Sequence, residues 1–234
     1  ANLSSEQKKN LDIIHRSGEH LLTLINQVLD LSKVEAGRMV LSTANFDLYY
    51  LLADIKDIFT LKAKDKNLQL IFECAFDVPQ YICTDEVKLR QVLINLINNA
   101  IEFTESGSVS VKVELNAQMQ KNREETTITF EVADTGVGIA AEELKNLFQP
   151  FVQTASGQQM HQGTGLGLTI SREFVRLMGG EITVISSQAF RPSTSKTPSG
   201  TTFKFNIPVK IGDESAIKNP SKSDRIIALA PNQP

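Results

Sequence analysis

The chain has few cysteines and contains no long run of apolar or of basic residues. Only two of its 234 residues are cysteine, Cys74 and Cys83, and both lie in or beside apolar, strand-like stretches. Two cysteines without nearby histidines form neither a zinc site nor a disulfide framework. We therefore expect two free, buried thiols and a reducing compartment.

The other two absences concern membranes and nucleic acids. No apolar stretch approaches the roughly 20 residues that cross a bilayer, and no signal-peptide pattern opens the chain. We expect a cytoplasmic segment without membrane contact of its own, in a parent protein that could carry a membrane anchor upstream. The 24 basic and 27 acidic residues give a net charge of −3, and no basic run could follow a phosphate backbone, so nucleic acid is not an expected partner.

The first 38 residues have the pattern of one long helix. Ser4 and Gln7 have the spacing of a capping box, and Gly37 lies near the expected end. Apolar side chains cover about half of its circumference; they are Leu11, Ile14, Leu21, Leu22, Leu24, Ile25, Val28, Leu29 and Leu31. So wide a face is typical of a helix in a bundle. Because no equally long helix is predicted elsewhere, we expect its partner to lie outside this chain.

Helical and alternating patterns then follow one another as far as residue 209. We expect a helix that begins after Asp47, with Leu48, Leu51, Leu52, Ile55, Ile58 and Phe59 on its apolar face, and further helices over Asp85–Phe103, Ala140–Phe148 and Gly165–Met178. Strands are expected over Leu68–Ala75, Tyr81–Thr84, Val109–Leu115, Thr127–Ala133, Gly180–Ser186 and Thr201–Val209, with a polar hairpin tip at 118–125. This order predicts an α+β fold, a two-layer sandwich preceded by a long helix.

Three stretches carry residues suited to chemistry. In the third predicted helix, Asn95 and Asn99 are four residues apart and share a face. Asparagine is a poor helix former, so a plain surface stripe would more naturally use Glu, Lys or Gln, although a solvated face remains the alternative interpretation. Neutral amide oxygens can coordinate Mg²⁺ that already carries phosphate and water ligands.

The other two stretches are rich in glycine. Asp134–Ile139 follows a strand: its glycines let backbone approach a ligand closely, and the Asp134 carboxylate could accept a hydrogen bond from an adenine amino group. Gly163–Leu168 opens a helix, where unpaired N–H groups and the positive dipole end suit phosphates. Gly163–Leu168 is not a Walker A motif, because no Gly-Lys-Ser/Thr follows it. It is not a dinucleotide-binding fingerprint either, because no parallel βαβ pattern surrounds it.

In this order and spacing the stretches resemble the GHKL ATPase superfamily, and specifically its sensor histidine kinases. Residues 84–104 resemble the N box, Asp134–Ile139 the G1 box, Leu147–Phe151 the F box and Gly163–Leu168 the G2 box. The segment Leu29–Gly37 is similar to the end of the second dimerisation helix of hybrid kinases. Four ordered boxes rarely agree by chance.

The resemblance covers about residues 1 to 209 and implies a fold and a division into parts. The fold is the GHKL type, a mixed sheet covered by helices. Residues 1–44 would be part of a dimerisation and phosphotransfer domain, 45–210 the catalytic and ATP-binding domain, and 211–234 a linker or tail toward a further domain.

The resemblance also implies ATP and Mg²⁺ as cofactors and assigns residues to them. Asn99 would be the metal ligand, Asn95 the catalytic residue near the phosphates, and Asp134 the reader of the adenine amino group. Residues 151–162 would form the mobile ATP lid. The other implied nucleotide-binding residues are Gly136, Gly138, Ile139 and Phe151 and, at the phosphate end, Gly163, Thr164, Gly165, Leu166, Gly167 and Leu168.

The residue type at position 95 separates kinases from hydrolases within the superfamily. The hydrolytic members have a glutamate four residues before the metal-binding asparagine, and here that position is Asn95. A neutral amide cannot accept a proton as a general base. The resemblance therefore implies transfer of the γ-phosphate to a histidine, with dimerisation helices and a response-regulator receiver domain as partners.

The chain also departs from the family pattern. It has no phosphoacceptor motif: His15 and His20 are interpreted as polar-face residues, so the acceptor histidine is expected outside the chain. Glu102 replaces the usual lysine of the N box, and residues 152–162 contain no Lys or Arg. Because phosphoryl transfer depends on positioning and electrostatic stabilisation, a nucleotide-binding pseudokinase or regulatory module with little transfer activity is the alternative.

Overall fold

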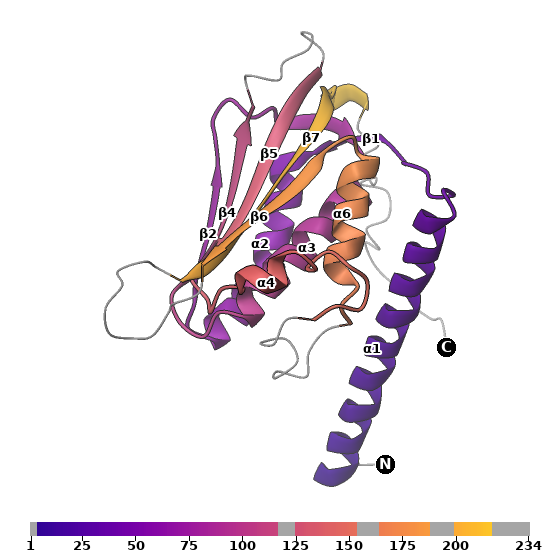
Figure 1. Ribbon diagram of the computed structural model, residues 1–234, viewed down its shortest axis with the longest axis vertical. Helices are drawn as coiled ribbons and strands as arrows, with labels where there is room; N and C mark the ends of the chain where they lie inside the picture. The colour runs from indigo at the N-terminus through magenta and orange to yellow at the C-terminus, as the bar shows by residue number, and fades with distance from the viewer. Residues whose placement is uncertain (1–3, 117–124, 154–163, 188–198, 217–234) are drawn as a thin grey trace, which may run out of the picture.

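The computed structural model describes residues 4–116, 125–153, 164–187 and 199–216. Helices α2, α3 and α6 cover one face of a twisted sheet, and the long helix α1 lies beside α6 (Figure 1). The helices are α1 (Ser5–Glu35), α2 (Leu48–Asp65), α3 (Glu86–Glu102), α4 (Ala141–Leu144) and α6 (Gly167–Leu177), with a short 3-10 turn at Glu214–Ala216. The strands are β1 (Ala44–Asp47), β2 (Gln69–Cys74), β3 (Tyr81–Thr84), β4 (Ser108–Leu115), β5 (Glu125–Asp134), β6 (Glu181–Ser187) and β7 (Gly200–Ile211).

The seven strands form one mixed sheet. Their order is β1-β3-β7-β5-β4-β2, and β6 also pairs with β7. The β2–β4 pair is parallel and the other pairs are antiparallel. The predicted α+β sandwich of a mixed sheet and helices is therefore confirmed.

Two elements differ from the sequence prediction. Strand β1 was not predicted; its four residues pair with β3, so a distant partner and not local periodicity makes it a strand. The helix expected over 140–148 ends at Leu144, because the amides of Leu147 and Gln149 bond to carbonyls three residues back. Such bonds form successive tight turns instead of α-helix.

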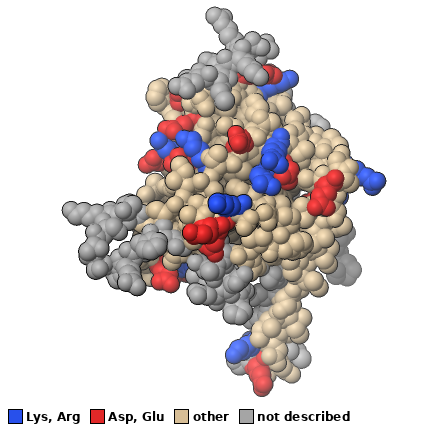
Figure 2. All heavy atoms as spheres, in the orientation of Figure 1, with Lys and Arg blue, Asp and Glu red and all other residues tan. Residues whose placement is uncertain are grey.

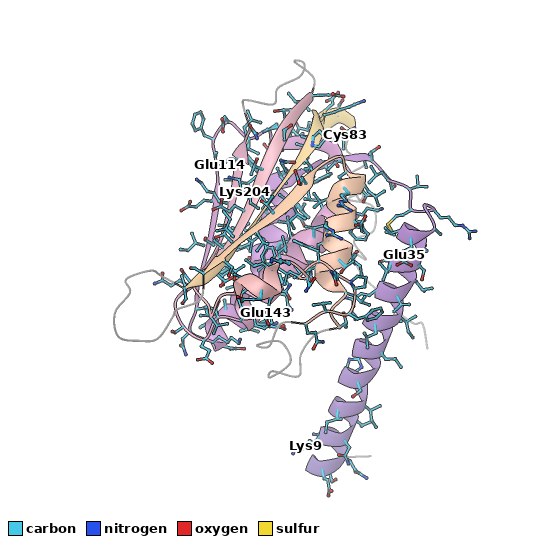
Figure 3. The ribbon with its side chains drawn as sticks, viewed as in Figure 1. Lys9, Glu35, Cys83, Glu114, Glu143 and Lys204 are labelled. Carbon is cyan, nitrogen blue, oxygen red and sulfur yellow. The ribbon has the colours of Figure 1, made fainter. Side chains whose placement is uncertain are left out.

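Helix α1 has the predicted cap and the predicted uncovered face. The Ser4 hydroxyl accepts from the Gln7 amide at 3.2 Å, and the Gln7 side chain accepts from the Ser4 amide at 2.9 Å. Gly37, with φ of +63°, follows the helix end. Most of the apolar face is exposed, and Leu31 is its buried member. In Figure 3 the turns around Lys9 extend away from the sheet and its helices.

Helix α3 lies at the centre of the core. Its residues Leu89, Leu93, Leu96 and Ile97 have no exposed surface. Two expectations about burial are wrong. The side chain of Ile58 in α2 is 56% exposed. Both cysteines are free, as predicted, but Cys74 is exposed and Cys83 only half-buried. Cys74 belongs to β2, which is an edge strand of the sheet, and edge strands have less cover.

No described helix has the length and apolar character needed to cross a bilayer.

Asp85 fixes the start of α3. Its buried carboxylate accepts hydrogen bonds from the Lys88 amide (3.0 Å), the Ser42 amide (2.8 Å) and the Lys88 ammonium group (2.7 Å). Burial alone would raise the pKa of Asp85, but the hydrogen bonds from Lys88 and Ser42 outweigh it and the pKa is lowered. A carboxyl group whose pKa falls on folding stabilises the fold above its unfolded pKa, and this contribution is lost as the pH drops through the folded pKa.

We therefore predict that Asp85→Ala lowers the free energy of unfolding by about 2–3 kcal/mol at pH 7, since it leaves Lys88 and two amides without their acceptor. The difference from the parent chain should shrink as the pH falls below about 4, the unfolded pKa of aspartate. Urea unfolding curves between pH 2.5 and 7 measure both effects. A difference that stays constant with pH would contradict the role of the ionised carboxylate.

Candidate functional site

The N-box residue Asn95 connects α3 to the start of α6. Its side-chain amide donates to the Ser171 hydroxyl at 2.9 Å. Its oxygen Oδ1 lies against Gly167, so closely that a Cβ atom built there would be 2.3 Å away. The structure thus brings Asn95 together with a glycine of the G2 box, and only a residue without a side chain fits at position 167 with Asn95 in this place.

Asn99 lies one turn further along the same face of α3. It is half-buried, and its side chain makes no hydrogen bond with another residue of the described segments. Nor do these segments gather three His, Cys, Asp or Glu side chains that could hold a metal. The amide oxygen of Asn99 suits Mg²⁺ as one neutral ligand, and phosphate and water oxygens would have to complete the coordination.

Glu102, the departure from the N-box pattern, is paired within the fold. Lys62 from α2 contacts both the Asn98 side-chain oxygen and, at 3.2 Å, the Glu102 carboxylate. The Asn98 amide also donates to this carboxylate at 3.0 Å. Part of the negative charge next to Asn99 is therefore balanced by a lysine from a neighbouring helix.

Asp134 ends β5 with its carboxylate turned into the G1 loop. Oδ1 accepts from the Gly136 amide at 2.8 Å and from the Thr201 amide at 3.2 Å. Burial raises the pKa of Asp134, and these two backbone hydrogen bonds only partly oppose it. Among the described residues no group donates to Oδ2, whereas Oδ1 is held by two backbone amides.

The G1 loop packs against the end of α3. The Val137 amide donates to the Phe103 carbonyl at 3.4 Å, and a Cβ atom at Gly136 would lie 2.3 Å from the same oxygen. Phe103 follows Asn99 by one helical turn, and its amide donates to the Asn99 carbonyl at 3.0 Å. On the other side of the loop, the Ile139 amide donates to the Ser186 hydroxyl at 2.7 Å.

The F box contacts the G2 box and the residue that follows it. The Phe151 amide donates to the Gly165 carbonyl at 3.0 Å, and the Thr169 hydroxyl donates to the Phe148 carbonyl at 3.0 Å. Phe151 has φ of +63°, which is uncommon outside glycine and is often found at functional sites. Its ring is exposed. Gly163 and residues 154–162 of the expected lid lie outside the described residues.

Helix α3 is thus the element on which the separate motifs converge. Asn95 contacts the G2 box, and Phe103 contacts the G1 box. Ser171 was missed from the sequence, although its place four residues after Gly167 puts it on the same helical face. Thr201 pairs with Asp134 across β5 and β7, a long-range register that has no local signal in the sequence.

Charge on the visible face is mixed. Lysine and arginine side chains alternate with aspartate and glutamate on it, and no patch of one sign extends across the face (Figure 2). This surface offers no continuous track for a phosphate backbone.

Two family descriptions match the chain. "Histidine kinase-, DNA gyrase B-, and HSP90-like ATPase" matches residues 84–211, and "His Kinase A (phospho-acceptor) domain" matches residues 1–37. The signal transduction histidine-protein kinase BarA of Escherichia coli (strain K12) is 37% identical over 220 residues, which are 94% of this chain and 23% of BarA. The chain therefore spans about a quarter of the length of that relative.

Solved structures show the same relationship. The crystal structure of full-length ShkA in complex with AMPPNP has a TM-score of 0.73 and 30% sequence identity, with 91% of this chain and 41% of ShkA covered. The histidine kinase ThkA in complex with the response regulator protein TrrA has a TM-score of 0.58 and 25% identity, with 89% of this chain and 53% of ThkA covered.

Proposed function

The chain belongs to the histidine kinase-, DNA gyrase B- and HSP90-like ATPase family and is the catalytic region of a sensor histidine kinase, and we propose that it transfers the γ-phosphate of Mg-ATP to a histidine outside these residues. The observation that carries the proposal is the convergence of the N, G1 and G2 boxes on α3. Residues 84–211, which match the family, contain all three.

The described side chains support a division of labour. Asp134 would accept a hydrogen bond from the adenine amino group through Oδ2, while its Oδ1 remains fixed by Gly136 and Thr201. The start of α6 would present backbone N–H groups to the phosphates. Asn95 and Asn99 would bind at the metal and phosphate end, where Mg²⁺ would neutralise phosphate charge.

The reaction needs no base from Asn95. The bond between the γ-phosphorus and the β–γ bridging oxygen breaks, a bond from the phosphorus to an imidazole nitrogen forms, and ADP leaves. The chain's own part is to position the two reactants and exclude water. An amide at position 95 fits this part, because it cannot activate water for hydrolysis.

The proposed partners follow from α1 and from the relatives. The exposed apolar face of α1 would join a four-helix dimerisation bundle. A response-regulator receiver is proposed because ThkA is known in complex with the regulator TrrA. Residues 211–234 would lead toward a further domain of a hybrid, cytoplasmically oriented kinase, and 1–44 would form part of the dimerisation domain.

A transfer assay tests the proposal. The chain is mixed with a dimerisation domain that carries a phosphoacceptor histidine, and radiolabelled ATP is added. We expect acid-labile, base-stable label on that domain, and none when its histidine is replaced by glutamine. Nucleotide binding without any such label would favour the regulatory module, which the comparisons do not support.

The metal role of Asn99 gives a second prediction. Asn99→Ala should weaken ATP binding about tenfold in the presence of Mg²⁺, equivalent to ~1.4 kcal/mol, because one ligand of the ion is lost. With excess EDTA the variant and the parent chain should bind ATP equally. Calorimetric titration under both conditions measures this. An equal loss with and without Mg²⁺ would show that Asn99 does not act through the metal.

A further inference from the structure

One side chain of α1 reaches the G2 box. The Thr164 hydroxyl donates to the Gln27 side-chain oxygen at 2.8 Å and accepts from the Leu166 amide at 3.1 Å. A hydroxyl has a single proton, so its donation to Gln27 fixes the rotation of the group. The lone pairs of the oxygen are then held toward the Leu166 amide. Gln27, Thr164 and Leu166 thus form a chain of contacts from one element to the other.

Leu166 is the N-cap residue of α6, and its N–H belongs to the end of the helix that offers unpaired donors. Such donors, with the positive end of the helix dipole, are what a phosphate group binds. In the structure this donor is already used by Thr164. A phosphate oxygen that binds the Leu166 N–H must replace the hydroxyl, and the hydroxyl then turns away from its present position.

We propose that Gln27 is a positioning residue that opposes phosphate binding: it holds the Thr164 hydroxyl on the Leu166 amide while α1 is docked against α6. Docking of α1 and binding of the nucleotide phosphates therefore compete. The inference rests on the proposed function for the location of the phosphates. By linkage, the factor by which docking weakens ATP binding equals the factor by which ATP weakens docking.

The small size of the contact makes this competition reversible. Among the apolar residues of α1 with described side chains, Leu31 is buried, at 8% exposure, whereas Leu21, Ile25 and Val28 are at least 44% exposed. No ion pair joins α1 to the rest of the described chain. Leu24 and Val34 are partly buried, so the docked stripe of α1 is narrow, and the hydrogen bond from Thr164 to Gln27 lies within it.

Ligand titrations of Gln27→Ala test the inference. We expect ATP to bind the variant three- to tenfold more tightly than the parent chain, and adenosine, which has no phosphate, to bind both equally. Asn26→Ala, the same loss of an amide at the neighbouring exposed position, should change neither affinity. A general loss of fold would weaken both ligands. Unchanged or weaker ATP binding by Gln27→Ala overturns the inference.

A double-mutant cycle identifies Thr164 as the intermediary. Thr164→Val removes the hydroxyl, and in that background Gln27→Ala should have no further effect on ATP affinity. Thr164→Ser keeps the hydroxyl and should preserve the effect of Gln27→Ala. An equal effect of Gln27→Ala in all three backgrounds would show that it does not act through this hydroxyl, and would overturn the inference.

Amide hydrogen exchange separates this inference from the proposed function, because it needs no nucleotide. The Leu166 amide should exchange several-fold faster in Gln27→Ala than in the parent chain or in Asn26→Ala. If the parent chain bound no Mg-ATP, the proposed function would fail whatever this exchange showed. If it bound Mg-ATP while Gln27→Ala changed neither ATP affinity nor exchange, the inference alone would fail.

Discussion

Asp134→Asn is expected to weaken ATP binding about 100-fold while it stabilises the fold. Asparagine can keep the acceptor Oδ1 that bonds to the Gly136 and Thr201 amides. The second oxygen, however, becomes an NH₂ group, and this donor would face the donor amino group of adenine. Losing a hydrogen bond to a charged acceptor costs roughly 1.5–3 kcal/mol, and 100-fold in affinity corresponds to ~2.7 kcal/mol.

The effect of Asp134→Asn on stability should depend on pH. Burial raises the pKa of Asp134, so its contribution to stability is fully present below the unfolded pKa of about 4 and is lost as the pH rises through the raised folded pKa. At pH 7 the buried carboxylate therefore costs free energy that asparagine does not. The variant should unfold at higher urea concentration than the parent chain at pH 7, and the difference should shrink toward pH 4.

Asp85→Ala is the matched contrast, since the pKa of that carboxyl group is lowered by Lys88 and Ser42. The two variants should change stability in opposite directions at neutral pH. Calorimetric titration with ATP and urea unfolding at several pH values provide both readouts. If Asp134→Asn were destabilised at pH 7 and bound ATP normally, the carboxylate would be a structural group and not the adenine acceptor.

Local patterns were enough to predict most elements of this fold. The capping box of α1, the start of α3 at Asp85 and the alternation along β4 and β5 each depend on residues close together in the sequence. An element defined by a distant partner was missed. Strand β1 exists because it pairs with β3. The other error is local: α4 ends at Leu144, and tight turns follow where a helix was predicted as far as Phe148.

The same division applies to the candidate site. Glycine and asparagine spacing identified Asn95, Asp134 and the G2 box, but spacing alone does not show what each side chain contacts. Lys62 illustrates the point: nothing in the sequence connects it with Glu102, forty residues away, and yet the pair balances a charge that looked unfavourable for ATP. Gln27 likewise has no feature in the sequence that separates it from the other polar residues of its helix; its contact with Thr164 appears only in the structure.

Gly167→Ala should reduce phosphoryl transfer about 100-fold and leave the protein folded. Alanine is normally the better helix residue by about 0.8–1 kcal/mol, so the loss must come from contact: the new Cβ would lie 2.3 Å from Asn95 Oδ1 and 3.2 Å from its Nδ2. These atoms end a side chain, so Asn95 can rotate away at little cost in stability, but it then loses its 2.9 Å hydrogen bond to Ser171 and its orientation.

A displacement of about 1 Å at a reacting centre can cost 100-fold in rate, and the transfer assay with radiolabelled ATP measures it directly. Gly18→Ala in α1 is the control, because a Cβ there meets no atom within 4 Å, and it should leave transfer unchanged while stabilising the helix by about 0.5–1 kcal/mol. The clash falls on Asn95 alone. Normal transfer by Gly167→Ala would therefore mean that the orientation of Asn95 does not matter for phosphoryl transfer. The proposed role of the N box would then rest on Asn99.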